Sequence, residues 1–138
     1  FYSTAYTLSD LQAALGLTQL TKYDEFLLKR EKLANGYFSS IAPKYTKLLK
    51  NVSSRSIFFR FPLTVERGFD AVFDEFLSEG VQVRRGVDTL LHRDAGFEDG
   101  CYMKSAELFR TTVSLPLYPS MVGAEERYIL SAVSRVLQ

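Results

Sequence analysis

The 138-residue chain has no tryptophan, one cysteine, one histidine and no long apolar run. Its longest largely apolar stretches, such as residues 57–59 and 113–117, fall far short of the roughly 20 residues that a membrane-spanning helix needs. A single cysteine, Cys101, excludes an internal disulfide and favours a reducing compartment such as the cytoplasm. An excess of one charge is also missing, because 17 basic residues face 16 acidic ones. This balance leaves no overall field to attract nucleic acid or an anionic membrane.

The motifs of common catalytic and metal sites are absent as well. The sequence has no glycine-rich nucleotide fingerprint, no Walker loop, no H-E-x-x-H and no C-x-x-C. His92 and Cys101 cannot form a metal site without carboxylate ligands, so we expect no metal. They could form a nucleophilic pair, but a loop histidine and a buried thiol are the simpler interpretation.

What the chain does contain is the composition of one folded domain, which we assign to residues 1–138. Hydrophobic residues make up 46% and aromatic residues 14% of a chain whose net charge is +1, and this excludes disorder. The length suffices to bury about two-thirds of the unfolded surface.

A long helical pattern opens the chain. Ser9 precedes Gln12 with the spacing of a capping box, and apolar residues then recur at helical intervals as far as Tyr37. Gly16 interrupts this pattern, so we expect a bend or close packing there and two consecutive helices in place of one rod. The second helix should end before Pro43.

Short strands and helices alternate in the rest of the chain, an arrangement typical of an α/β layered domain. The predicted strands are residues 56–61, 81–83 and 113–117, and the predicted helices are residues 68–78, 104–110 and 124–137, with a loop over 89–102. Tyr128 should point inward from the last helix. Six phenylalanines are assigned to the core: Phe58, Phe59, Phe61, Phe69, Phe73 and Phe76.

Two charged segments are candidates for binding. Arg84 and Arg85 precede the long charged loop that contains His92, and paired arginines at a strand end suit a phosphate or a carboxylate. The spacing does not decide between such a site and a loop whose charges pair with one another. Residues 44–55 form a basic run around Tyr45, which could bind nucleic acid, but a single aromatic side chain favours a solvated loop.

Several motifs together resemble one enzyme family in their order and spacing. They are L-S-D-L-Q-A-A-L-G-L-T-Q-L over residues 8–20, the set Arg30, Ala34 and Tyr37, residues 76–81, Leu91-His92, residues 105–108 and V-S-L-P-L-Y-P over 113–119. They resemble the C-terminal part of the DegT-type sugar aminotransferases. These are pyridoxal-phosphate (PLP) enzymes of the aspartate aminotransferase fold, which aminate keto-sugars carried on nucleotides.

The resemblance implies an α+β domain with long N-terminal helices and a small, largely antiparallel three-stranded sheet covered by helices. It implies a domain that closes the active site and contributes to a homodimer. The lysine that binds PLP in such enzymes belongs to a larger upstream domain. We therefore expect the 138 residues alone to be inactive and to hold no cofactor.

The family's cofactor-binding motif departs from its usual form here. The family reads G-x-N-x-R before the first helix, and its Asn reaches the phosphate of the neighbouring subunit's cofactor. Ser3, Ala5 and Thr7 occupy these positions, which leaves Tyr6 as the candidate cofactor contact. The resemblance places His92 near the substrate, where it would contact the substrate or orient its loop.

Arg84 and Arg85 are candidates for the phosphates of a nucleotide-sugar, by charge and not by motif. Two functions of other classes stay open. Ala5 and Thr7 favour an inactive, stand-alone binding or regulatory module derived from the family. The basic run at 44–55 would serve a nucleic-acid-binding domain, which ranks third.

Overall fold

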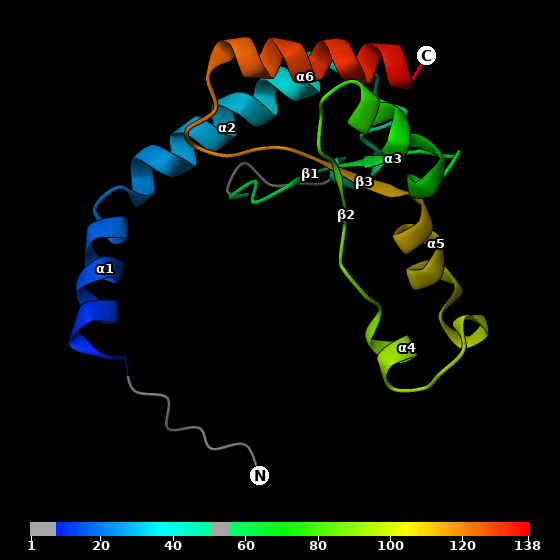
Figure 1. The fold of residues 1–138 in the computed structure, drawn as a ribbon, viewed down its shortest axis with the longest axis horizontal. Coiled ribbons are helices and arrows are strands. Elements are labelled where there is room, and N and C mark those ends of the chain that lie inside the picture. The colour runs from blue at the N-terminus through cyan, green and yellow to red at the C-terminus, as the bar shows by residue number, and fades with distance from the viewer. Residues whose placement is uncertain (1–7, 51–55) are drawn as a thin grey trace.

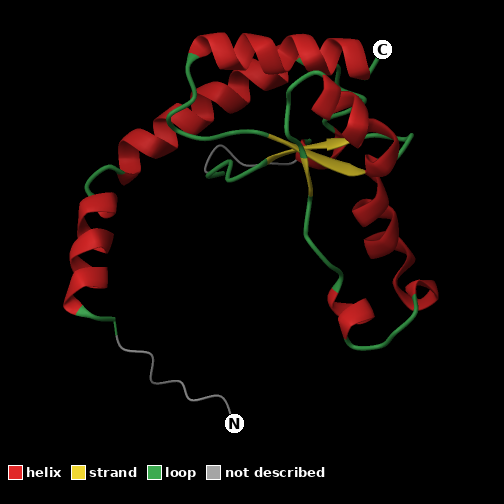
Figure 2. Cartoon of the chain, viewed as in Figure 1, coloured by secondary structure: helices red, strands yellow, loops and turns green. Residues whose placement is uncertain are grey.

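The computed structural model describes residues 8–50 and 56–138, which form an arch (Figure 1). Helices lie over the small sheet at the top of the arch, and two arms extend downward from it (Figure 2). One arm is α1, continued by α2, and the other holds α4 and α5. The α-helices are α1 (Asp10–Leu20), α2 (Tyr23–Ser40), α3 (Phe69–Ser78), α4 (Leu91–Asp94), α5 (Met103–Thr111) and α6 (Gly123–Val136). This confirms the predicted α+β class.

The sheet of the described residues has three strands in the order β1-β3-β2, namely β1 (Phe61–Thr64), β3 (Thr112–Leu115) and β2 (Arg84–Arg85). Both pairings are antiparallel, with Leu63 and Arg85 each opposite Val113. Alternate residues of a strand face opposite sides of the sheet. One side therefore carries the buried Phe61, Leu63, Val113 and Leu115.

Two of the predicted strands are wrong in position. Residues 56–60 are irregular, because Phe58 has a left-handed φ of 41°, and pairing begins only at Phe61. Pro62 lies within β1, which tolerates it because β1 is an edge strand. Residues 81–83 form no strand, although Val81 and Val83 are buried as the alternation predicted. If β2 continued back to 82, its partner would be Pro116, which has no N–H for the ladder.

The first two helices meet at residues 21–22 and not at the predicted Gly16. The predicted capping box is present, with the backbone N–H of Gln12 donating to Ser9 Oγ at 3.3 Å and that of Ser9 to Gln12 Oε1 at 2.9 Å. Nothing lies within 4 Å of a Cβ placed on Gly16, so the expected close packing is wrong. The Thr18 and Thr21 hydroxyls donate to the carbonyls of residues 15 and 18 at 2.7 and 2.9 Å. Such bonds compete with helical ones and favour an end there.

The other helices agree closely with the sequence. The α2 helix ends before Pro43, and α3, α5 and α6 lie within a residue of their predicted limits. Gly80 ends α3 with a φ of 71°, as its backbone N–H donates to the carbonyl of Leu77 and that of Val81 to Phe76, each at 2.9 Å. The predicted loop at 89–102 contains α4 and a 3₁₀ turn over Asp99–Tyr102.

The core lies between the sheet and the helices α2, α3 and α6. Tyr37 is fully buried, meets Phe61 edge-on with ring centroids 5.0 Å apart, and donates its hydroxyl to the carbonyl of Pro116 at 2.8 Å. Burial raises the pKa of Tyr37, so the hydroxyl stays a donor. Four of the six predicted core phenylalanines are buried and Phe73 partly so.

Two residues predicted to be internal lie on the surface instead. Phe59 is 63% exposed, because its neighbour Phe58 takes the inward position. Tyr128 is also exposed, and its hydroxyl donates to the carbonyl of Glu79 at 2.8 Å across the end of α3. A phenol can cover a helix end and keep its hydroxyl at the surface, which an apolar pattern does not reveal.

Candidate functional site

The predicted site residues lie in three places. Tyr6, with Ala5 and Thr7, lies outside the described residues. His92 belongs to α4 in the second arm, and Arg84 and Arg85 form β2, which leads into that arm. In the structure, Arg85 and the His92 segment share one neighbour, Phe109, whereas Arg84 lies on the other face of the sheet.

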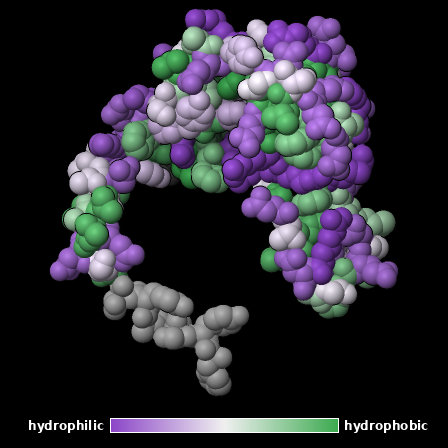
Figure 3. Space-filling view, viewed as in Figure 1, coloured by the Kyte–Doolittle hydropathy of each residue, from purple (hydrophilic) through white to green (hydrophobic). Residues whose placement is uncertain are grey.

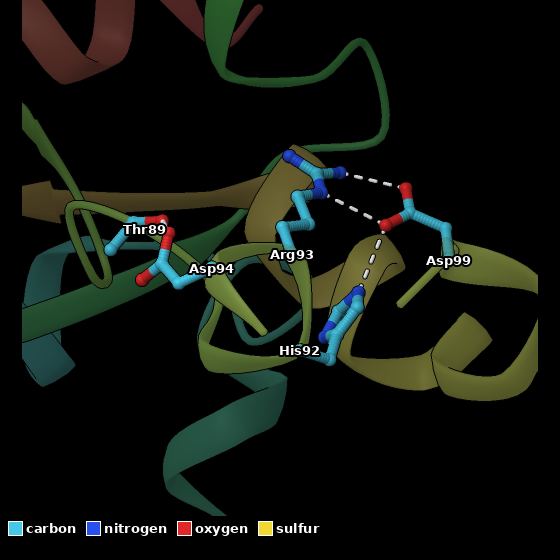
Figure 4. A network of polar contacts seen from close by, with 5 residues as sticks. All are labelled: Thr89, His92, Arg93, Asp94 and Asp99. Carbon is cyan, nitrogen blue, oxygen red and sulfur yellow. Dashed lines mark hydrogen bonds and ion pairs between the residues drawn. The ribbon is translucent and has the colours of Figure 1, made fainter. Parts of the chain in front are cut away.

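His92 is the centre of a polar cluster that ties α4 to the following 3₁₀ turn (Figure 4). Its Nε2 lies 2.9 Å from Asp99 Oδ1, and its ring stacks on Tyr102 with centroids 4.5 Å apart. Arg93 grips the same carboxylate, with Nε 2.9 Å from Oδ1 and Nη2 2.7 Å from Oδ2. Beside it, the Thr89 hydroxyl donates to Asp94 Oδ1 at 2.9 Å. These contacts fix the loop from within.

The charge state of this cluster follows from its geometry. Hydrogen bonds from Arg93 and then from His92 hold the pKa of the Asp99 carboxyl far below its usual value. An ionised carboxylate only accepts, so Nε2 of His92 carries the donated proton and Nδ1 is the free ring nitrogen of the neutral form. The side chain of His92 is only 7% exposed. Its observed contacts orient the loop, one of the two roles considered for it, and its contact with substrate stays a prediction.

The expected nature of His92 and Cys101 is reversed. The histidine, taken for a loop residue, is buried in a short helix, whereas the cysteine, taken for a buried thiol, is exposed. Burial of an isolated polar group is unfavourable, but His92 is hydrogen-bonded to Asp99 and stacked on Tyr102, which offsets the desolvation of its ring. No local motif encodes those two partners.

Arg84 and Arg85 point to opposite faces of the sheet, as neighbours on a strand must. Arg85 is already engaged. Its guanidinium lies 4.3 and 4.7 Å from the ring centroids of Phe69 and Phe109, donates to the Phe109 carbonyl at 3.2 Å, and pairs with Asp70. Arg84 is exposed and faces Ser114 across the ladder. The two guanidiniums therefore do not converge on one phosphate.

Phe109 links the strand to the polar cluster. Arg93 lies over the ring of Phe109 with its Cζ 5.0 Å from the centroid, so Arg85 and Arg93 share one aromatic neighbour. Cation–π contacts of this kind hold a guanidinium without cancelling its charge. Two ion-paired arginines, Arg85 with Asp70 and Arg93 with Asp99, thus meet at one half-buried ring at the base of the second arm.

A hollow of about 280 Å³ lies on the sheet face that carries Arg84. Arg60, Gln82, Arg84 and Ser114 are its polar lining residues, and Phe59 is exposed at its rim. Sequence reasoning missed Arg60 and Ser114. No local signal marks them, because Ser114 is brought opposite both Pro62 and Arg84 only by the strand register.

A larger hollow of about 580 Å³ lies beside α6. Tyr118 and Tyr128 edge it, and the Tyr118 hydroxyl donates to Glu125 Oε1 at 3.2 Å. Desolvation and the neighbouring carboxylate raise the pKa of Tyr118. Its lining comes from segments 80–82, 116–118 and 124–129, which explains why no local motif pointed to it.

Side chains of the basic run at 44–50 make contacts within the chain itself. The Tyr45 hydroxyl bonds to the carbonyl of Leu137, and Lys44 Nζ lies 4.7 Å from the Tyr45 ring centroid. Lys47 Nζ lies 3.5 Å from Glu66 Oε1. A half-buried, tethered tyrosine is a poor platform for stacking a base.

The described residues contain neither a helix able to span a membrane nor a cluster of metal-binding side chains. In residues 8–50 and 56–138, no helix combines the length and the apolar character needed to cross a bilayer. Within the same residues, no three histidine, cysteine or carboxylate side chains gather into a group that could hold a metal ion.

Known proteins similar to this chain share both its sequence pattern and its fold. Among curated relatives, the spore coat polysaccharide biosynthesis protein SpsC of Bacillus subtilis is 25% identical over 143 residues, covering 94% of this chain and 36% of SpsC. The dTDP-4-dehydro-2,3,6-trideoxy-D-glucose 4-aminotransferase of Saccharopolyspora spinosa is 28% identical over 137 residues, covering 94% of this chain and 35% of the relative. The chain thus spans little more than a third of these relatives.

Solved structures with a similar fold come from aminotransferases. A crystal structure of a DegT DnrJ EryC1 StrS aminotransferase from Brucella abortus superposes with a TM-score of 0.81 at 18% identity, covering 99% of this chain and 40% of the other. The sequence profile of the DegT/DnrJ/EryC1/StrS aminotransferase family matches residues 2–134. With nearly its whole length matched, the chain belongs to the DegT/DnrJ/EryC1/StrS aminotransferase family.

Proposed function

We propose that this chain is the C-terminal domain of a PLP-dependent aminotransferase that acts on nucleotide-linked keto-sugars. The observation that carries the proposal is the family match over residues 2–134 in a chain that covers 35–36% of its curated relatives. One of those relatives is named for amination of a dTDP-linked sugar and the other for polysaccharide biosynthesis. The exposed thiol of Cys101 suits the reducing cytoplasm as its location.

The family is PLP-dependent, and we propose that the cofactor is held chiefly by residues outside this chain. PLP enzymes hold the cofactor through a lysine in a sheltered pocket, where the cofactor acts as an electron sink for amino-group transfer. Every lysine in residues 8–50 and 56–138 is exposed. We therefore assign the cofactor to another domain of the complete protein.

The first arm supports a role in assembly. No residue of α1 is buried, and Leu11 and Leu15 are 72% and 59% exposed on one of its sides. Leu17 and Leu20 are equally exposed on the opposite side, and Figure 3 shows the hydrophobic side chains of this arm at the surface. A helix that is apolar on two sides normally packs between two partners. The upstream domain and the second subunit of a homodimer are the partners that we propose.

The second arm supports a role at the substrate. The Asp99 carboxylate and the Tyr102 ring hold His92 in one orientation, so its free nitrogen has a fixed direction. We propose that α4 lies against the nucleotide-sugar when this domain closes one side of the active site. His92 then contacts the substrate or positions the loop that does.

The test uses the complete protein that contains this chain. Purified with PLP, it should show the cofactor's visible absorbance and convert a nucleotide-linked keto-sugar into an amino-sugar, detected by mass spectrometry with a panel of amino donors. His92→Gln should raise KM for the sugar. The matched control Arg127→Gln, an exposed residue on α6, should not.

The competing function is an inactive binding module, which the Ala5 and Thr7 substitutions in the cofactor motif favour. It predicts a complete protein that neither retains PLP nor aminates any keto-sugar but still binds a nucleotide-sugar in calorimetry. Retention of PLP together with amination would exclude it.

A further inference from the structure

We propose that the hollow on the second face of the sheet is a binding site for a small oxyanion, a carboxylate or a phosphate, held by Arg60, Arg84 and Ser114. The proposal does not depend on the aminotransferase function, because it rests on the charge, shape and unsatisfied polar groups of the hollow itself.

Strand register brings the three residues together. Ser114 lies opposite Arg84 in the β2–β3 pair and opposite Pro62 in the β1–β3 pair. Residues directly opposite each other in an antiparallel pair share a face. Arg60 and Arg84 therefore approach the hollow from the two edges of the sheet, and Ser114 lies between them on the central strand.

The cationic charge of the hollow is not neutralised by any described residue. The ion pairs of residues 8–50 and 56–138 include neither Arg60 nor Arg84, and no acidic side chain lines the hollow. Arg60 Nη1 instead donates to the backbone carbonyls of Arg85 and Gly86, at 2.9 and 3.5 Å. Neutral carbonyls orient the guanidinium without cancelling its charge, which leaves its other N–H groups for a ligand.

Phe59 adds to this positive potential by organising a third arginine. The Cζ atoms of Arg30 and Arg60 lie 5.9 and 5.6 Å from its ring centroid. Within the described residues, Arg30 forms no ion pair either, and its Nε is buried without a hydrogen-bond partner. Arg30 thus brings a third positive charge to the ring of Phe59, at the rim of the hollow.

Ser114 provides the observation that points most directly to a ligand. The residue is 5% exposed, it lines the hollow, and its hydroxyl has no hydrogen-bond partner among residues 8–50 and 56–138. A buried hydroxyl without a partner is costly, and native structures rarely retain one without a reason. An oxyanion in the hollow would accept a hydrogen bond from this hydroxyl and relieve that cost.

The size and the donors define the ligand class. About 280 Å³ is below the usual range of pockets for drug-sized ligands and suits a group of a few heavy atoms. The planar guanidinium matches the two oxygens of a carboxylate or a phosphate. The site would therefore hold a free phosphate, or the acidic group of a small metabolite, and not a whole nucleotide-sugar.

The test is isothermal titration calorimetry of the full chain with inorganic phosphate and, separately, with L-glutamate. We expect saturable binding of one or both, with a dissociation constant of about 1 mM or lower. Binding of phosphate alone would identify a phosphate site, and binding of glutamate alone a carboxylate site. At ten times the dissociation constant, the ligand should raise Tm by about 5 °C.

Two variants and one control separate the site from general charge effects. Arg84→Ala should weaken binding at least tenfold, and Arg84→Lys should recover only part of it because a point charge replaces the fork. Ser114→Ala should weaken binding while leaving the Tm of the free chain unchanged or higher, since it removes an unsatisfied group. The exposed arginine variant Arg127→Ala should bind as the wild type does. Absence of saturable binding, or equal loss in Arg127→Ala, would overturn the proposal.

Discussion

Replacing Leu11 and Leu15 by Gln should leave this chain intact but destabilise the complete protein. Both side chains are exposed here, at 72% and 59%. Gln has nearly the same helix propensity as Leu, so the double variant should change the stability of the 138-residue chain by less than about 0.5 kcal/mol per site. That corresponds to a shift in Tm of no more than about 3 °C.

The same change acts differently where α1 is covered. Full burial of a leucine contributes about 1.5–3 kcal/mol, and roughly two-thirds of each side chain is still exposed here, so docking would gain about 3 kcal/mol from the pair. The double variant should lose that amount in the complete protein, which lowers its Tm by about 4 °C. In the chain alone, it should reduce the fluorescence of an apolar dye bound to α1.

A core substitution provides the comparison. Leu63 is fully buried in the sheet, and Leu63→Ala should cost about 2–5 kcal/mol in both the chain and the complete protein. Differential scanning calorimetry of the two variants in both proteins gives the required values of Tm. The reasoning is refuted if Leu11→Gln/Leu15→Gln lowers the Tm of the chain as Leu63→Ala does, or leaves the complete protein as stable as the wild type.

Three further predictions concern the stability of the chain. Tyr37→Phe leaves the carbonyl of Pro116 without its donor and should cost about 1–2 kcal/mol, measured by urea unfolding. The pKa of Asp99 is lowered in the folded state, so its stabilisation is complete above the unfolded value of about 3.9 and is lost as pH falls toward the folded one. As pH falls below about 4, the Tm of Asp99→Asn should therefore decrease less than the Tm of the wild type. Above pH 5, the Tm values of the two proteins should change in parallel with pH. Gly80→Ala, at a φ of 71° and with the Tyr128 hydroxyl 3.1 Å from the new Cβ, should lower Tm, whereas Gly16→Ala in open space should raise helix content by circular dichroism.

The helices were predictable because their signals are local. The Ser9–Gln12 capping box and the left-handed Gly80 each act within one turn of the residue that carries them. The break between α1 and α2 was misplaced because helix propensity singled out Gly16, whereas two threonine hydroxyls end the helix at 21. Propensity tells where a helix is weak and not where a competing bond forms.

The strands and the site depended on distant partners. Residues 81–83 alternate as a strand should, but a strand needs a ladder, and Pro116 ends it on the partner side. The resemblance identified the family correctly and marked His92. The two partners of His92, Asp99 and Tyr102, belong to no recognisable motif. Arg60 was overlooked because its relation to Arg84 exists only through the register of β3.

The order β1-β3-β2 also sets the sequence of events in folding. The central strand is the last of the three to be synthesised, and Thr64 must wait for Thr112 while Phe61 waits for Leu115. Until β3 has been synthesised, the outer strands β1 and β2 have no strand to pair with, and the sheet cannot form from local contacts alone. A chain truncated before residue 112 would keep both outer strands but have nothing to join them. Completion of the sheet is therefore coupled to translation of residues 112–115.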